Sequence, residues 1–198
     1  MYNPWTLPTS VVANGHEYKI RTDYRVVIEL LTALSDPDMQ GDSEAETEMI
    51  RAELVTGILF EDEIQRGDLE AALNAASAFI DMGIEEGNKN PIRLMDWEQD
   101  ARIIIPAINN VAGFEIREKE YLHWWTFLSY YMGIGECTFS HIVGIRSKKI
   151  KGEKLMDWEQ KFIKENPDMV LLHEKLTDEE KAERDAEMDE IDKLLGLK

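Results

Sequence analysis

Basic side chains are scarce in this sequence, and their scarcity disfavours two classes of partner. Lysine and arginine number 22 against 40 aspartates and glutamates, which gives a formal net charge of -18 over 198 residues. Binding to a nucleic-acid backbone or to an anionic membrane depends on clustered basic side chains. The charge balance therefore argues against both, and it favours partner proteins that present basic patches.

Cysteine and long apolar runs are also nearly missing. The single Cys137 cannot form a disulfide within the chain or a cluster of thiolate metal ligands. No apolar run approaches the roughly 20 residues that a membrane-spanning helix needs, and residues 1–25 lack the basic and apolar parts of a secretory leader. We therefore expect a protein of a reducing cytoplasm that is neither secreted nor inserted in a membrane.

The common catalytic and metal-binding motifs are missing as well. The sequence has no glycine-rich phosphate loop, no G-x-S-x-G elbow and no HExxH motif. The segment from Asp36 opens like a calcium-binding EF-hand loop, but Thr47 stands where the twelfth position requires glutamate. The four histidines are His16, His123, His141 and His173. None of them has a histidine or an acidic residue at the spacing of a known metal-binding motif. We predict no enzymatic activity, no metal site and no cofactor. An enzyme with an acidic site stays open as an alternative, because paired carboxylates leave no spacing signature in a sequence.

The residues that are present form one hairpin pattern followed by helical patterns. Asn14-Gly15 lies between two short strand-like stretches and suits the positive backbone angles of a type I′ turn. Apolar residues then recur at helical spacing in segments that begin near residues 22, 43, 68, 96, 117, 139, 155 and 177. The sequence predicts a mainly α fold: a multi-helix bundle with a short N-terminal β-hairpin and an acidic C-terminal helix.

The same patterns divide the chain into three expected parts. Residues 1–22 form an arm and hairpin, residues 23–165 a helical domain, and residues 166–198 an acidic C-terminal helix or tail. Inside the helical domain, the run Gly87-Asn88-Lys89-Asn90-Pro91 disfavours helix and marks a candidate subdomain break near residues 86–95. The last part carries an apolar seam that could support self-association, formed by Ala182, Met188, Ile191, Leu194 and Leu195.

One hexapeptide occurs twice in the sequence. Leu-Met-Asp-Trp-Glu-Gln stands at residues 94–99 and again at residues 155–160. Two copies do not make a repeat architecture. We expect each copy to place its tryptophan at the start of a helix.

The most apolar predicted helix runs from Arg117 to Met132. Adjacent residues on a helix point about 100° apart, so Trp124 and Trp125 cannot both face one narrow core. Two interpretations stay open: neighbouring elements sandwich the helix, or one side of it forms a partner-binding groove with aromatic anchors. Under the second interpretation, the predicted partner-binding residues are Tyr121, Trp124, Trp125, Leu128 and Tyr131.

Five short stretches, taken in order, carry a resemblance to a known family. They are Leu7-Pro8 with the hairpin to Tyr18, Thr22–Arg25, Asp96–Asp100, Leu122–Leu128 and Ile142–Arg146. Their order and spacing resemble the gene-product-fifteen family, which is encoded among the tail genes of siphophages of Gram-positive bacteria and is regarded as a family of tail assembly chaperones. The resemblance covers most of the chain up to about Lys154 and leaves the acidic tail uncovered.

The resemblance implies a protein made late in infection that acts in the host cytoplasm and is absent from the finished virion. Its implied partner is the tape measure protein, with the tail tube protein as a second expected partner, and no catalytic residues carry over. A tape measure protein is expected to be a long helical chain with apolar seams, which an acidic helical protein could cover while keeping the complex soluble.

The alternative function that the composition suggests is an acidic mimic of DNA that inhibits a host nucleic-acid-binding protein. Such an inhibitor would present regularly spaced surface carboxylates, and its binding would weaken as salt rises. Here the acidic residues are concentrated toward the C-terminus. That distribution fits a solvating tail better than a DNA-shaped surface.

Overall fold

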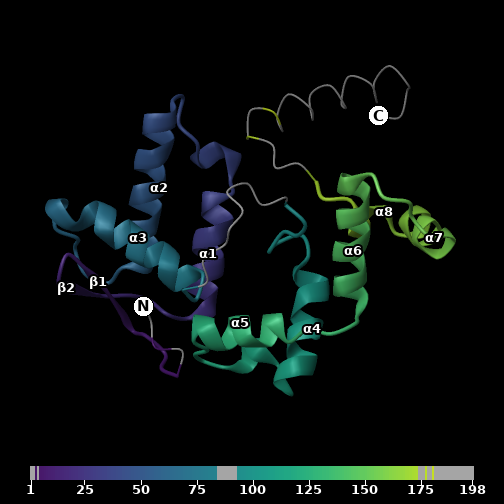
Figure 1. Ribbon diagram of the computed structural model, residues 1–198, viewed down its shortest axis with the longest axis horizontal. Helices are drawn as coiled ribbons and strands as arrows, with labels where there is room; N and C mark the ends of the chain where they lie inside the picture. Colours follow the sequence, from purple (N-terminus) through teal and green to yellow (C-terminus); the bar gives the residue numbers. More distant parts are fainter. Residues whose placement is uncertain (1–2, 4, 84–92, 174–176, 178–179, 181–198) are drawn as a thin grey trace, which may run out of the picture.

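The structure is a computed structural model, and it describes residues 3, 5–83, 93–173, 177 and 180. It confirms the mainly α fold with one hairpin (Figure 1). The expected break at residues 87–91 lies outside the described residues, and of the helix expected from Thr177 only Thr177 and Glu180 are described. The elements are β1 (Ser10–Ala13), β2 (His16–Lys19), α1 (Tyr24–Leu34), η1 (Pro37–Met39), α2 (Glu44–Leu59), η2 (Arg66–Asp68), α3 (Leu69–Ile80), α4 (Ala101–Ala112), η3 (Ile116–Glu118), α5 (Trp124–Met132), α6 (Thr138–Lys151), α7 (Asp157–Glu165) and α8 (Pro167–Val170).

The hairpin forms where the sequence predicts it. β1 and β2 pair antiparallel with Ala13 opposite His16, so Asn14 and Gly15 are the two turn residues. Their φ angles of 49° and 89° are both positive, as a type I′ turn requires. Buried Asp68 fastens the strands to the start of α3 by accepting hydrogen bonds from Asn14 Nδ2 (3.0 Å) and Tyr18 Oη (2.6 Å).

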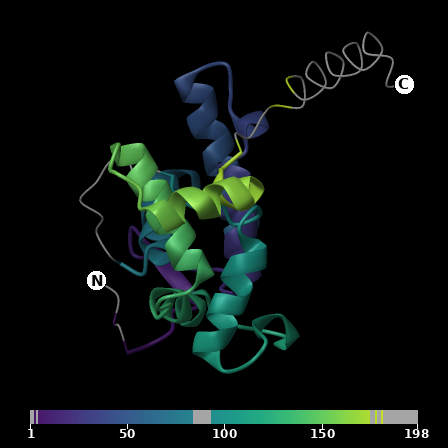
Figure 2. The same cartoon turned by 90° about the vertical axis from the view of Figure 1, so that its right-hand side faces the viewer.

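The first two helices begin close to the predicted positions, residues 22 and 43, with Asp23 and Ser43 as their N-caps. The Asp23 carboxylate accepts from the Arg25 amide at 2.9 Å, and the Ser43 hydroxyl accepts from the Glu46 amide at 3.2 Å. The amphipathic pattern predicted for α2 is correct only near its C-terminal end, where Leu59 is buried. Met49 is 59% exposed, because the first turns of α2 stand away from the other helices (Figure 2).

An aromatic core fills the space between α1, α3, α4 and α5. The rings of Tyr24 and Phe127 stack at 4.7 Å, and Phe127 also stacks on Trp124 at 5.5 Å. Trp124 and Trp125 are 2% and 3% exposed. Their indole N–H groups donate to the backbone carbonyls of Ile80 and Phe79, each at 2.8 Å. Helix α5 is therefore sandwiched, as the first of the two interpretations of the tryptophan pair proposed.

The predicted start of the aromatic helix at Arg117 is wrong by seven residues, because α5 begins at Trp124. A bridge between Asp23 and His123 holds the preceding segment extended: the Tyr24 amide donates to Leu122 O at 2.9 Å, and the Trp124 amide donates to Thr22 O at 2.7 Å. Pairing with a segment a hundred residues earlier thus replaces the helical hydrogen bonds that the local pattern favours.

His123 is the N-cap of α5 and a core residue. Its Nδ1 accepts from the Trp125 amide at 3.0 Å, so the other ring nitrogen, Nε2, carries the proton and donates to Pro8 O at 2.9 Å. Burial lowers the pKa of His123, which favours this neutral form. Both ring nitrogens of His123 therefore have hydrogen-bond partners in the backbone.

The two copies of the hexapeptide fold differently. In the first copy, Asp96 accepts from the amides of Glu98 and Gln99 in a turn before α4, and Trp97 packs against the aromatic core. In the second copy, Trp158 is the second residue of α7 and is 49% exposed. The predicted position at a helix start is therefore correct only for the second copy.

Helices α6 and α8 pack on a smaller second core made of Ile142, Ile145 and Val170. The helix α6 begins at Thr138, close to the predicted start near residue 139, and it ends before Gly152, whose φ is 67°. Beside this core, the buried guanidinium of Arg146 meets the buried carboxylate of Asp100 at 2.6 and 2.8 Å. Within the described ranges, no helix is both long and apolar enough to span a bilayer.

Candidate protein-binding groove

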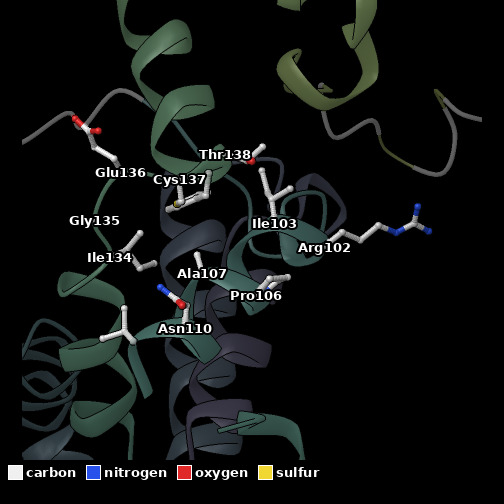
Figure 3. A pocket seen from close by; sticks show the side chains of 12 residues that line it. Arg102, Ile103, Pro106, Ala107, Asn110, Ile134, Gly135, Glu136, Cys137 and Thr138 are labelled. Atoms are coloured by element: carbon white, nitrogen blue, oxygen red, sulfur yellow. The ribbon is translucent and has the colours of Figure 1, made fainter. Parts of the chain in front are cut away.

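A groove of about 360 Å³ lies between α4 and the turn that joins α5 to α6 (Figure 3). One wall is the outer side of α4, and the other wall is the turn itself with the first residues of α6. The volume is at the lower end of the roughly 300–1,000 Å³ of small-molecule pockets. The residues that line it are Arg102, Ile103, Pro106, Ala107, Asn110, Val111, Ile134, Gly135, Glu136, Cys137, Thr138 and Phe139.

The floor of the groove is apolar and its rim is polar. Ala107 and Phe139 are buried at the base, and Ile134 is half-buried beside them. Arg102 and Glu136 are exposed and extend from opposite sides of the hollow (Figure 3). An apolar floor within a rim of both charge signs resembles the anatomy of a protein interface.

Close packing of α5 against α4 sets one end of the groove. Gly133 ends α5, and a Cβ added there would lie 3.1 Å from Val111 Cγ1, closer than ordinary van der Waals contact. The absence of a side chain at Gly133 lets the turn approach α4. Val111 itself stays at the groove edge with 37% of its surface exposed.

The lining offers little for chemistry. Cys137 supplies the one thiol of the groove, and neither a histidine nor a buried carboxylate lines the groove beside it. In the described part of the chain, no three histidine, cysteine or acidic side chains gather as metal ligands would. The groove is suited to accepting apolar side chains of another molecule.

The five predicted partner-binding residues do not form one exposed surface. Trp124 and Trp125 are core residues, and Leu128 and Tyr131 are half-buried around them. The Tyr131 ring lies against Trp97 at 5.5 Å, and burial raises the pKa of its hydroxyl. Among the described residues, Trp124 and Trp125 are therefore not exposed as anchors for a partner.

Tyr121 is the one exposed member of the predicted set, at 55%. It precedes α5, and its hydroxyl lies 2.6 Å from Thr22 Oγ1, at a separate hollow beside β2 and α1. The groove residues on α4 and in the α5–α6 turn were missed by the sequence analysis. Pro106, which stands inside α4, is one of these residues, and the sequence pattern gave no sign that it borders a groove.

The fold and groove thus define a mainly α, acidic protein with an apolar surface groove. The profile of the family described as Bacteriophage Gp15 protein matches residues 6–170. The chain belongs to this phage protein family. Neither the curated proteins nor the solved structures contain a match.

Proposed function

We propose that this protein is a tail assembly chaperone that binds the tape measure protein of its phage during tail morphogenesis. It acts in the host cytoplasm, is not an enzyme, and is left out of the mature virion. The observation that carries the proposal is membership of the Bacteriophage Gp15 family over residues 6–170. The tail tube protein is a second proposed partner.

The groove between α4 and the α5–α6 turn is the proposed contact site. A helical segment can lay a strip of apolar side chains into an apolar groove, with residues recurring at positions i, i+3, i+4 and i+7. The half-buried Ile134 and the exposed Val111 offer apolar surface for such a strip. We expect a helical segment of the tape measure protein to present such a strip.

The net charge of -18 supports the same role. A chaperone that covers an aggregation-prone apolar chain must keep the complex in solution, and like charges on neighbouring complexes repel each other. The first turns of α2 add exposed Glu44, Glu46 and Glu48 to this charged surface. Self-association through the apolar seam of the last part of the chain is a separate proposal.

The test is a titration of the full chain with the tape measure protein of the same phage, followed by calorimetry. Val111→Asp places a charge at the groove edge and should weaken binding at least about tenfold, the effect of ~1.4 kcal/mol. The matched control is Met49→Asp on the exposed part of α2, which should leave the affinity unchanged.

Equal affinities for Val111→Asp and the unaltered chain, with both folded by circular dichroism, would exclude the groove as the contact site. The alternative function, an acidic inhibitor of a host nucleic-acid-binding protein, predicts a different result. Duplex DNA would then compete for the partner, and the binding would fall steeply with salt.

A further inference from the structure

A second hollow, of about 300 Å³, lies at the junction of α6 and α8 beside the smaller core, and the core residue Val170 is part of its lining. Its surface is largely apolar, and two of its residues remain well exposed, Ile150 at 51% and Leu171 at 42%. The lining consists of Arg93, Arg146, Lys149, Ile150 and Val170–Leu172. We call it the α6–α8 hollow.

Basic side chains border this hollow, which is unusual in so acidic a chain. Arg146 at its base is neutralised by Asp100, and Arg93 at its edge pairs with Asp96. Lys148 on the neighbouring face pairs with Glu159 at 2.7 Å. Among the described residues, Lys149 has no carboxylate within ion-pair distance and leaves an uncompensated positive charge at the rim.

The chain itself leads directly out of the hollow toward its acidic segment. Leu172 is part of the wall, and the next residue is fixed beside it, because the His173 amide donates to Gln99 Oε1 at 3.0 Å. Residues 178–192 then contain nine carboxylates and two basic side chains. The sequence adds apolar residues at helical spacing within and after this stretch: Met188, Ile191 and Leu195.

We propose that the α6–α8 hollow is the docking site for the acidic C-terminal segment, residues 178–195, of the same chain. The apolar seam covers Ile150 and Leu171, and the carboxylates meet the positive rim at Lys149. Four residues lie between His173 and Asp178. The five Cα-to-Cα steps from His173 to Asp178 span at most about 17 Å, so the acidic segment begins within reach of the hollow.

Contact within one chain needs little affinity. A short linker holds the segment at an effective concentration in the millimolar range, so an apolar seam and a few exposed charge pairs suffice to keep the hollow covered. Most of the attraction between exposed charges is screened at high salt, because the Debye length falls from about 10 Å at 0.1 M to about 3 Å at 1 M. The docked state should therefore be salt-sensitive.

The experiment is zero-length carbodiimide cross-linking of the full chain, with peptide mass spectrometry. The reagent joins a lysine amine to a carboxylate only where the two are in contact. An equal mixture of unlabelled and ¹⁵N-labelled chains separates links within one chain from links between two chains. We expect Lys149 to link to carboxylates of residues 178–192 within one chain, and the yield to fall at 1 M salt.

Two variants test the apolar part of the contact while leaving Lys149 in place. Ile150→Asp puts a charge in the hollow and should lower the Lys149 links about fivefold or more, the equivalent of ~1 kcal/mol. Met49→Asp, equally exposed and on α2, should leave them unchanged. Links of mixed label would overturn the proposal in favour of a second copy. Links spread evenly over all exposed lysines, or unaffected by Ile150→Asp, would overturn it outright.

Discussion

Replacement of Arg146 by methionine should destabilise the protein strongly, because the guanidinium is a buried connector. Its nitrogens donate to both oxygens of Asp100 and also to three backbone carbonyls, those of Leu94, Met169 and Val170. The side chains of Arg146 and Asp100 are 4% and 2% exposed. Methionine fills a similar volume but supplies none of these donors.

The expected cost follows from what the substitution leaves behind. The Asp100 carboxylate keeps one hydrogen bond, from the Asp96 amide at 2.9 Å, but loses its buried counter-charge. Breaking a buried ion pair by removal of one partner costs about 3–5 kcal/mol. For a chain of this size, each kcal/mol lowers the melting temperature by about 2–4 °C, so Arg146→Met should melt roughly 6–20 °C below the unaltered protein.

Thermal and urea unfolding, followed by circular dichroism, measure this loss. The matched control is Arg117→Met, since Arg117 pairs with Glu115 at 2.7 Å while its side chain is 62% exposed. Exposed pairs contribute about 0–1 kcal/mol, so this variant should melt close to the unaltered protein. Adding Asp100→Leu to Arg146→Met should recover part of the loss. Equal melting of the two arginine variants would refute the role assigned to Arg146.

Two further predictions concern the aromatic core and the hairpin. Trp125→Phe removes the indole N–H that donates to Phe79 O, and it should lower the free energy of unfolding, measured in urea, by about 1–3 kcal/mol. Trp158→Phe, at an exposed position on α7, should change the free energy of unfolding little. Equal losses in the two variants would contradict the burial of α5. The pKa of Asp68 is held below its ordinary value by three donors, Tyr18, Asn14 and His16. Its folded-state pKa is therefore below the unfolded-state value, so its contribution to stability is complete above about pH 4 and is lost as the pH falls through the folded-state pKa. Urea midpoints measured between pH 5 and pH 2 should fall less steeply in Asp68→Asn than in the unaltered protein, and an equal slope would contradict this account.

Features that depend on neighbours in the sequence could be predicted. The Asn14-Gly15 turn needs only two residues that tolerate positive φ, and the caps at Asp23 and Ser43 need only a side-chain oxygen near the first free amides. Each of these interactions closes within a few residues. The local sequence therefore determines them before any tertiary contact is made.

Features that depend on distant contacts could not be predicted. Tyr121 and Leu122 fit a helical pattern, yet Asp23 draws this segment into an extended bridge through its carboxylate, which accepts from the Leu122 amide at 3.0 Å. The two hexapeptide copies show the same limit, because identical local sequences give a turn at Trp97 and a helix start at Trp158. Tertiary packing decides between structures of similar local energy.

The groove was hidden from the sequence for the same reason. Its two walls come from α4 and from the α5–α6 turn, which are separated by η3 and all of α5. The tryptophan pair was the more conspicuous feature, but conspicuous aromatic residues more often fill a core than a surface. The packing position of α5 determines which apolar residues of α4 stay exposed. Only the structure shows that Val111 is one of these exposed residues.

The most direct test of the proposed chaperone function is affinity purification of the tagged protein from phage-infected cells, with mass spectrometry of the co-purifying proteins and of finished virions. We predict that the tape measure protein co-purifies, that Val111→Asp strongly reduces its recovery while Met49→Asp preserves it, and that purified virions lack the chain. Recovery of a host nucleic-acid-binding protein without any tail protein, or detection of the chain in finished virions, would contradict the account.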